Sequence, residues 1–551
     1  MAQFDLYTPS ASQIKYAVVG LLGVYILQGT IKFIAQGVYW RRRFRNTPNM
    51  PQPPHHWLLG HLLVMAKITQ ELPMDAHPHV QIPFLLEKYN LKDTGVMYLD
   101  IWPMGSPMVI VTDPNMAYQC AQQNPLPKAK KELDPILGPL SGPGNLVASD
   151  GNLWKFWRSV FNPGFAVQHL MTLVPGIVKD CETFCKVMEK AAASGKVVNL
   201  EKLTTCLTID IIGRVVLDEE LETQDRPHPL VEAFKSQISW LPAAVEYNPW
   251  NRWHPMRPVM YWLNQRIMRG ILGGMLDKRF HSRDPMLNSG KRSKPIIDLA
   301  LETYFKEKEG NVTNMDDEFR ANAITQMMIF VFAGHDTTSS TICYIFHKLS
   351  YFPEKMAKAR KELDEIFGTN LDDAPRMLSE NPHLMNKMEY CTAIIREILR
   401  MYPPASSVRD GQKGFYIKDD KGNLYPTEDI MVWLASLPVH VNEQYWKDPR
   451  EFRPERWLED DIPKDAWRPF ERGPRNCIGQ ELAMIETKVI MALTLRKFNI
   501  EAQKQPPPPN GVNEVCGEFV YQVLAGSAKP KGGMPSIIKM APTDLIAPRV
   551  L

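Results

Sequence analysis

The chain has 551 residues, and its 64 Lys and Arg against 61 Asp and Glu give a formal net charge of +3. With 44% hydrophobic and 23% charged residues it is typical of a globular protein with a large core. This composition excludes a disordered chain, a collagen and a bundle of many membrane spans. The length fits several average domains or one large domain. The eight cysteines are scattered without a CxxC pair, which argues against a disulfide scaffold and a zinc ribbon.

The segment from Tyr16 to Trp40 predicts a membrane anchor. Lys32 is its only charged residue, and as a helix it would span about 37 Å, enough for a hydrocarbon core of about 30 Å. The basic run from Arg41 to Arg45 follows and predicts that this end of the anchor faces the cytosol. The alternative is a cleaved signal peptide, which the long apolar run and the lack of a small-residue cleavage site disfavour.

The positive charge is concentrated in residues 1–45, which carry +5 and leave −2 for the remainder. No basic body is left to favour nucleic acid as a partner. We therefore interpret the arginine run as a contact with anionic lipid headgroups. Four prolines at 48–54 predict a stiff hinge over residues 46–56, and we expect the globular part to begin near Trp57.

Beyond the hinge, alternating apolar residues over 79–115 predict strands. Helical periodicity dominates from about 150 to 405 and is clearest over Glu318 to Tyr351, a helix that Pro353 ends. We expect a second helix over 384–402, a loop-like stretch over 403–476, a last helix over about 478–497 and short strands over 510–540. The prediction is one large, mainly α domain over residues 57–551 with a small β portion.

Residues 470–479 read FERGPRNCIG and match FxxGxRxCxG at every fixed position. Cys477 stands just before a predicted helix, whose free N–H groups and dipole favour a thiolate. Gly473 and Gly479 permit a tight turn and the close approach of a flat macrocycle. Arg475 is suited to a carboxylate such as a haem propionate. The alternative is a buried structural cysteine, but the flanking pattern favours a thiolate ligand of haem iron.

With this loop the chain resembles the cytochrome P450 family of haem-thiolate monooxygenases, microsomal type, from the hinge to the end. The resemblance implies the cytochrome P450 fold and haem b, with Cys477 as the axial iron ligand and Phe470 and Arg475 against the cofactor. The segment LWKFWRSVFNPGFAVQHLMTLVP further resembles microsomal enzymes of fungal secondary metabolism.

Residues 333–338, AGHDTT, lie midway along the predicted long helix. Gly334 weakens a helix, and the Thr337 hydroxyl can bond a carbonyl one turn back, which would open a groove beside bound O₂. We expect Asp336 and Thr337 to be the catalytic acid–alcohol pair that delivers protons. The alternative is an ordinary helix defect. We interpret His335 as a polar helix residue and not as an iron ligand.

Glu397 and Arg400 form an ExxR pair on one helix face. Arg456, in the run FRPERW, resembles the third member of the family's Glu–Arg–Arg cluster. The resemblance implies that these three residues support the haem loop and take no part in the chemistry. By itself an ExxR pair also fits a surface ion pair.

Trp154 and Arg158 stand four residues apart, so a helix places both donors on one face, where they suit haem propionates. The alternative is a core tryptophan beside a solvated arginine. Arg409 resembles another propionate contact of the family.

Four tryptophans predict either a patch at the membrane interface, beside what the resemblance implies is a flexible lid, or simple core packing: Trp240, Trp250, Trp253 and Trp262. By resemblance the pocket is formed by residues 133–146, 324–332, 405–408 and 519–524. These segments are mostly apolar, which predicts a lipophilic substrate.

We therefore predict a single-pass protein of the endoplasmic reticulum membrane whose catalytic domain is cytosolic. It would insert one oxygen atom from O₂ into a lipophilic small molecule, in a secondary-metabolite pathway. No GxGxxG motif and no fused flavin domain are visible. We thus expect electrons from NADPH through a separate NADPH–cytochrome P450 reductase, docking near Lys155, Arg468 and Arg472.

Three alternatives remain. A haem-thiolate isomerase or dehydratase would act without a reductase, and the presence of Asp336 and Thr337 argues against it. A non-catalytic membrane haem protein would bind sterol-like ligands. An anchored helical scaffold would hold no haem at all.

Overall fold

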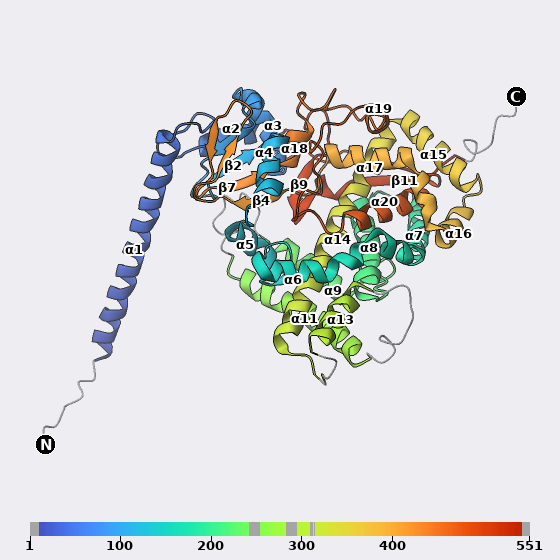
Figure 1. The fold of residues 1–551 in the computed structure, drawn as a ribbon, viewed down its shortest axis with the longest axis horizontal. Coiled ribbons are helices and arrows are strands. Elements are labelled where there is room, and N and C mark those ends of the chain that lie inside the picture. Colours follow the sequence, from blue (N-terminus) through green and yellow to red (C-terminus); the bar gives the residue numbers. More distant parts are fainter. Residues whose placement is uncertain (1–9, 242–253, 283–294, 309–311, 313, 543–551) are drawn as a thin grey trace, which may run out of the picture.

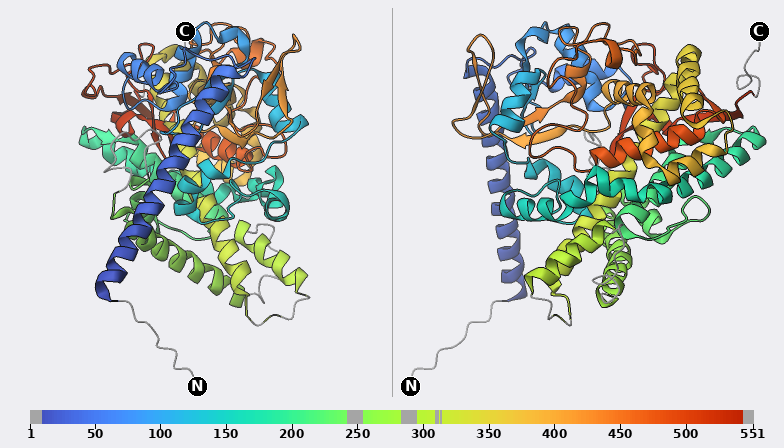
Figure 2. Two further views of the ribbon diagram at one scale, coloured as in Figure 1. Left: turned by 90° about the vertical axis from the view of Figure 1, so that its left-hand side faces the viewer. Right: turned by 45° about the vertical axis from the view of Figure 1, so that its right-hand side comes forward.

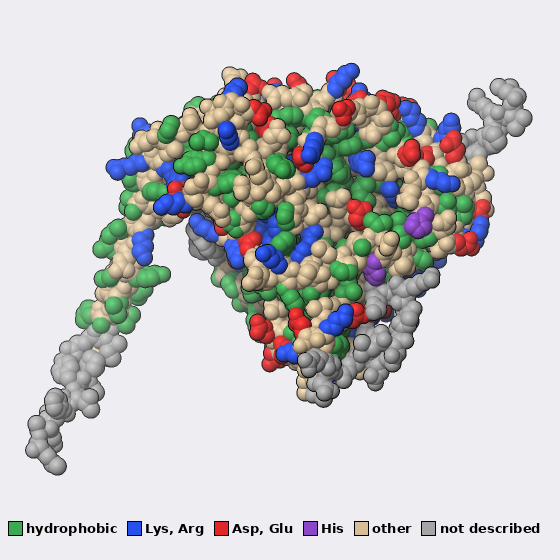
Figure 3. Space-filling view, viewed as in Figure 1, with side chains coloured by type: hydrophobic (Ala, Val, Ile, Leu, Met, Phe, Trp, Pro, Cys, Tyr) green, Lys and Arg blue, Asp and Glu red, His purple; other side chains and the backbone are tan. Residues whose placement is uncertain are grey.

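The computed structural model describes residues 10–241, 254–282, 295–308, 312 and 314–542. It shows a helix-rich body with one long helix, α1 (Ala11–Asn46), standing off at one side (Figure 1). Within the described ranges, α1 is the one helix that is long and apolar enough to cross a membrane. In Figure 2, α1 crosses in front of the body in the left view and runs along its left edge in the right view. In the space-filling view α1 is largely hydrophobic, whereas charges of both signs cover the body (Figure 3).

The last turns of α1 are docked against the body. Trp40 and Phe44 are buried, and Phe44 stacks on His55. Arg41 is buried as well, forms an ion pair with Asp100 and donates to backbone carbonyl oxygens. The packing of the body therefore begins inside α1, well before the Trp57 that the sequence indicates. Part of the arginine run is bound by protein groups, which corrects its interpretation as a headgroup contact alone.

The N-terminal part of the body contains α2 (Leu62–Glu71), α3 (Pro78–Lys88) and a four-stranded sheet. The sheet order is β1 (Val96–Leu99), β2 (Met108–Val111), β7 (Met431–Leu434) and β4 (Ser407–Asp410). Only the β2–β7 pair is parallel. The strands predicted over 79–115 are thus present from residue 96, and the preceding residues form α3. Pro78 at the first position and the His77 side chain, which accepts from the N–H of His79, start this helix.

Helices build most of the remainder, as predicted. Their bounds are α4 (Pro114–Tyr118), α5 (Lys130–Ser141), α6 (Gly151–Phe161), α7 (Val167–Ser194), α8 (Leu200–Ile212), α9 (Pro229–Ser239), α11 (Arg257–His281), α13 (Ile296–Glu307), α14 (Asp317–Tyr351), α15 (Pro353–Phe367), α16 (Asp373–Glu380), α17 (Glu389–Met401), α18 (Ser436–His440), α19 (Arg456–Glu459) and α20 (Gln480–Thr494).

Helix α14 runs through the middle of the body and is buried along most of its length (Figure 1). The Asp316 side chain caps its start by accepting from the N–H of Phe319. Its neighbours include α8, α5 and α17, so α14 forms the central wall against which the site is built.

The described residues contain seven further short strands. Residues 403–476 are less loop-like than predicted, because β4, β7 and a hairpin of β5 (Tyr416–Lys418) and β6 (Leu424–Pro426) lie there. A three-stranded sheet has the order β3 (Val198–Asn199), β11 (Pro535–Met540) and β8 (Phe498–Ala502). The hairpin of β9 (Gln522–Ala525) and β10 (Ser527–Pro530) packs on α14, where the Ser340 hydroxyl donates to the carbonyl of Ala528 at 2.9 Å.

The predicted tryptophan patch is described only in part. Trp240 is half-buried and Trp262, on α11, is exposed. Trp250 and Trp253 lie outside the described residues.

Candidate functional site

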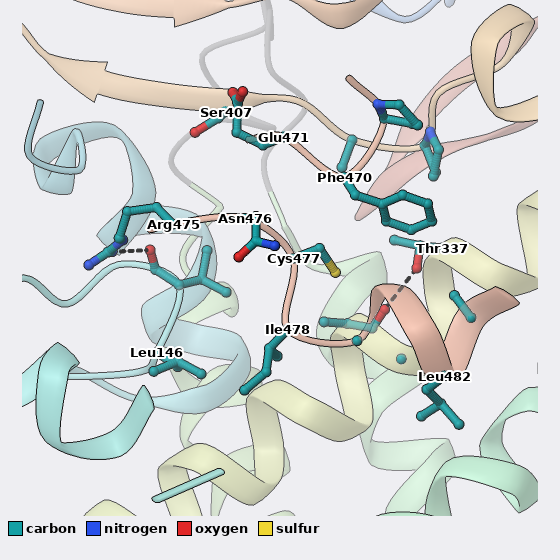
Figure 4. A pocket seen from close by; sticks show the side chains of 18 of the residues that line it. Leu146, Thr337, Ser407, Phe470, Glu471, Arg475, Asn476, Cys477, Ile478 and Leu482 are labelled. Atoms are coloured by element: carbon teal, nitrogen blue, oxygen red, sulfur yellow. Dashed lines mark hydrogen bonds between the residues drawn. The ribbon is translucent and has the colours of Figure 1, made fainter. Parts of the chain in front are cut away.

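The loop 470–479 presents Cys477 to a cavity. The N–H of Cys477 donates to the carbonyl of Phe470 at 2.8 Å, which closes the loop. Gly473 has φ +80°, and a Cβ there would collide with the backbone of Ala121, so glycine is required by both conformation and space. Figure 4 shows Cys477 and Phe470 beside Thr337 in this cavity. The predicted loop geometry is therefore present.

Several groups act on the Cys477 thiol. Burial raises its pKa, and the N–H of Gly479 and the charge of Arg158 oppose that rise. Helix α20 begins three residues later, at Gln480, so the positive end of its dipole also faces the sulfur. The side chain is exposed to the cavity, as the ligand of a bound cation must be. Among the described residues no group of three or more His, Cys, Asp or Glu side chains could hold a metal ion by itself.

The cavity has a volume of about 260 Å³. It lies between the cysteine loop, α6, α14 and the segment 404–407. On α14, Gly334 packs against α8, because a Cβ there would lie 2.5 Å from Ile212. Close helix packing thus explains this glycine, and α14 continues unbroken through it. The Thr337 hydroxyl lines the cavity and donates to the carbonyl of Ala333 at 3.0 Å, as the sequence predicts.

One end of the cavity gathers positive charge. Lys128 lines the cavity and is buried, and its Nζ lies 2.9 Å from the Ser407 hydroxyl. Arg409 is also buried and is joined to Lys128 by a backbone β-bridge, just behind the lining. Two nitrogen atoms of Arg409, Nε and one terminal nitrogen, are buried without a hydrogen-bond partner among the described residues. Arg475 lies 3.3 Å from Asp150 and stacks on the ring of Trp154, with 4.3 Å between the guanidinium carbon and the ring centroid.

This cluster fits a ligand that carries carboxylates. Burial lowers the pKa of Lys128, and the like charges of Arg409 and Arg475 lower it further. Burial also lowers the pKa of Arg475, to about 10. Cations that are desolvated and pushed together favour an anion at the same place. The residues present therefore match haem, with propionates at the cationic end and Cys477 at the iron. Sequence reasoning missed Lys128, because a single lysine in a loop carries no pattern.

Arg158 is hydrogen-bonded to the cysteine loop. Its guanidinium donates to the backbone carbonyl and to the side-chain Oδ1 of Asn476, both at 2.8 Å, and its Nε donates to Asn162. It thus braces the residue before Cys477, whereas the sequence predicts a propionate contact. Trp154 does lie beside the cationic cluster, through its contact with Arg475.

Glu397, Arg400 and Arg456 are brought together as predicted. Arg400 donates to Glu397 at 2.8 and 2.9 Å, and Arg456 Nε donates to the same carboxylate at 3.0 Å. Burial favours the neutral form of Glu397, but these arginines hold its pKa below the usual range. Arg400 also donates to the carbonyl oxygens of His440 and Pro449 at 2.7 Å, so the cluster ties α17 to the segment that leads into the cysteine loop.

Asp336 and Thr337 are adjacent on α14 but face different surroundings. Asp336 is fully buried, and its Oδ1 lies 2.7 Å from Lys529 Nζ. Thr337 lines the cavity and Asp336 does not. His335 also lies off the cavity lining, and burial lowers its pKa so that it is neutral. Sequence reasoning missed Lys529, which is nearly two hundred residues away in the chain.

The fold and the cysteine loop define the protein as a haem-thiolate protein. A sequence model of the family Cytochrome P450 matches residues 50–522, and the chain belongs to this family. It is 37% identical over 541 residues to cytochrome P450 monooxygenase polC of Polytolypa hystricis, covering 96% of each chain. It is 33% identical over 503 residues to cytochrome P450 monooxygenase acrF of Aspergillus aculeatus, covering 86% of this chain and 99% of the relative.

A solved structure agrees in fold. The haem domain of cytochrome P450DA superposes with a TM-score of 0.67 at 19% identity, over 90% of this chain and 98% of that chain. The relatives and the family support a cytochrome P450 monooxygenase with a haem-thiolate iron cofactor. The predicted family, fold class and enzyme class are thereby confirmed.

Proposed function

We propose that the protein inserts one oxygen atom from O₂ into a lipophilic small molecule of a secondary-metabolite pathway. The observation that carries this proposal is the Cys477 loop facing Thr337 across a cavity whose cationic end suits haem propionates. Haem, when bound, supplies the iron chemistry that activates O₂. Cys477 would hold the iron, and Lys128, Arg409 and Arg475 would hold the propionates.

The lining of the cavity supports a lipophilic substrate. The cavity is lined from α14 and from the segments around residues 146 and 405 by mainly apolar side chains. The polar side chains that these three segments contribute are hydroxyl groups, such as those of Thr337 and Ser406. An apolar wall with few hydroxyls orients a molecule by shape and by one or two hydrogen bonds.

The anchor supports placement at the endoplasmic reticulum membrane, with the catalytic body on the cytosolic side. The apolar side chains of α1 between Tyr16 and Tyr39 are largely exposed. Met256, which precedes α11, and Val259, Trp262 and Leu263 on α11 add further exposed apolar side chains at helical spacing. These side chains offer a second apolar contact with lipid.

Electrons would come from NADPH through a separate NADPH–cytochrome P450 reductase. Lys155 and Arg472 are exposed near the cysteine loop and suit an acidic partner surface. Arg468 does not, because it is buried and paired with Glu471. This residue is therefore removed from the predicted docking surface.

The test uses the purified full-length protein. Its reduced form with carbon monoxide should give the difference spectrum of a thiolate-ligated haem, and substrate oxidation should require NADPH and the reductase. Turnover of a peroxide without NADPH would instead support the isomerase or dehydratase. Ligand-induced spectral shifts without NADPH consumption would support a binding protein, and a colourless preparation would support a scaffold. Profiling of metabolites lost on deletion of the gene would then identify the substrate.

A further inference from the structure

A buried lysine links Asp336 to the rim of the molecule. Lys529 Nζ, on β10, lies 2.7 Å from Asp336 Oδ1 on α14 and 2.5 Å from Glu201 Oε1 on α8. Side-chain exposure falls from 18% at Glu201 through 13% at Lys529 to 0% at Asp336. The three charges thus form a row that leads from partly exposed Glu201 to the buried side of the cavity wall.

The carboxylate of Asp336 is held away from the cavity. The β9–β10 turn packs against it, since a Cβ at Gly526 would lie 3.2 Å from Asp336 Oδ2. Thr337, by contrast, lines the cavity, and its hydroxyl donates to Ala333, which leaves its oxygen free to accept a proton or hydrogen bond. For Asp336 to exchange a proton with Thr337, its carboxylate has to leave Lys529.

Lys529 acts as a fixed cation. Burial alone would lower its pKa, but the charges of Asp336 and Glu201 raise it above the usual range, so the ammonium keeps its proton at neutral pH. His335, the other titratable neighbour of Asp336, is neutral because burial lowers its pKa. Lys529 is therefore a partner that Asp336 can leave or rejoin, and not a proton donor.

We propose that Lys529 is a positioning residue that keeps Asp336 retracted from the cavity, and that Glu201 retains Lys529 whenever Asp336 swings toward Thr337. Two carboxylates compete for one ammonium, so release of Asp336 does not strand an unpaired buried cation. Glu201 is itself held, because the Thr205 hydroxyl donates to it at 3.0 Å and also contacts the Ser339 hydroxyl at 3.0 Å. This inference rests on the proposed monooxygenase function.

The ion pairs among Glu201, Lys529 and Asp336 affect the delivery of protons and not that of electrons. Reduction of O₂ to water consumes four electrons and four protons, whereas reduction to hydrogen peroxide consumes two of each. NADPH supplies the electrons through the reductase, and Asp336 passes protons from solvent to Thr337. When protons arrive late, more of the oxygen leaves as peroxide and less as water.

The test compares variants of the full-length enzyme in lipid nanodiscs with NADPH and the reductase, without added substrate. NADPH consumed, O₂ consumed and peroxide released are measured together. In the Glu201→Gln variant, Asp336 is the one carboxylate left to pair with Lys529, so the Lys529–Asp336 ion pair becomes stronger. We expect peroxide per NADPH to rise about twofold to fivefold, the size of one partly screened ion pair. Glu201→Asp should restore the wild-type ratio.

The double variant tests whether Glu201 acts on Asp336 through Lys529 or only stabilises the fold. In the Lys529→Met background the ion pair with Asp336 is absent. Adding Glu201→Gln should therefore cause no further change in the peroxide released per NADPH. Lys531→Met is the matched control, because Lys531 lies two residues along, pairs with Asp75 at the surface and should leave the ratio unchanged. An unchanged ratio in Glu201→Gln, or the same rise in both backgrounds, would overturn the proposal.

Thermal unfolding of the oxidised protein gives a readout that needs no turnover. Lys529→Met leaves Asp336 buried without a counterion and should lower the midpoint, whereas Asp336→Asn combined with Lys529→Met should recover part of the loss. Equal midpoints for the single and double variants would count against the pair. If Lys529→Met does not fold, the Glu201 variants still decide the question. A wild-type protein that binds haem but consumes no NADPH would refute the proposed function, while the unfolding comparison would still test the ion pair.

Discussion

Replacing Glu397 by Gln removes a carboxylate that neutralises two arginines in the interior. Arg400 and Arg456 are 0% and 1% exposed, and both donate to this carboxylate. A glutamine of the same shape keeps one acceptor oxygen but places an N–H₂ group against donors. Both guanidinium groups would then lie buried without a counterion.

The expected loss follows from that geometry. Breaking a buried ion pair on one side costs about 3–5 kcal/mol, against a total stability of about 5–15 kcal/mol for a typical protein. Urea unfolding of the detergent-solubilised protein, followed by haem absorbance and by circular dichroism, should show a lower midpoint than that of the wild type. Haem absorbance should be lost first, because the cluster supports the cysteine loop through Pro449 and His440.

Arg376→Gln is the control. Arg376 is exposed and pairs with Asp373 and Glu380 on the same helix, so its replacement should change the stability little. A Glu397→Gln variant that loses no more stability than this control would refute the idea that the buried cluster supports the loop.

Four further predictions concern the cavity. Cys477→Ala should abolish the thiolate-type carbon monoxide spectrum, and retention of that spectrum would reject Cys477 as the ligand. Thr337→Ala should keep haem and release more peroxide per NADPH; full coupling would reject the relay. Arg409→Met should speed transfer of haem to apomyoglobin, since Arg409 adjoins Lys128 and has two buried nitrogen atoms without a partner among the described residues; an unchanged rate would remove it from the propionate site. Burial raises the pKa of Glu486 to about 8, above its value in the unfolded chain. The protonated side chain therefore stabilises the fold fully below about pH 4.5, and this contribution is lost as the pH rises to about 8. Glu486→Gln should therefore flatten the decline in unfolding midpoint over that range, and a parallel decline would contradict the assignment.

Local patterns in the sequence predicted much of the fold and of the site. The helix predicted over Glu318 to Tyr351 is α14, and the last predicted helix is α20, shifted by a few residues. The loop around Cys477 was predictable because its glycines and arginine are fixed by steric and charge demands within ten residues. The strand prediction was wrong over 79–88, where Pro78 and the His77 cap start a helix that apolar alternation does not reveal.

Long-range pairing could not be predicted from local patterns. Lys529 and Lys128 are isolated lysines in the sequence, and their importance arises from the segments that folding brings against them. Arg158 shows the same limit in another way. Its spacing from Trp154 correctly places it at the cavity, but its partners, Asn476 and Asn162, depend on tertiary packing.

The docked end of α1 fixes the direction of this helix relative to the body. Phe33 packs on Trp102, eight residues before the Arg41 that pairs with Asp100, so α1 contacts the body at more than one point. A span longer than the local hydrocarbon thickness adjusts by tilting. With α1 in the bilayer, that tilt would be transmitted to the whole catalytic body, so bilayer thickness would set the height at which its entrance meets the lipid.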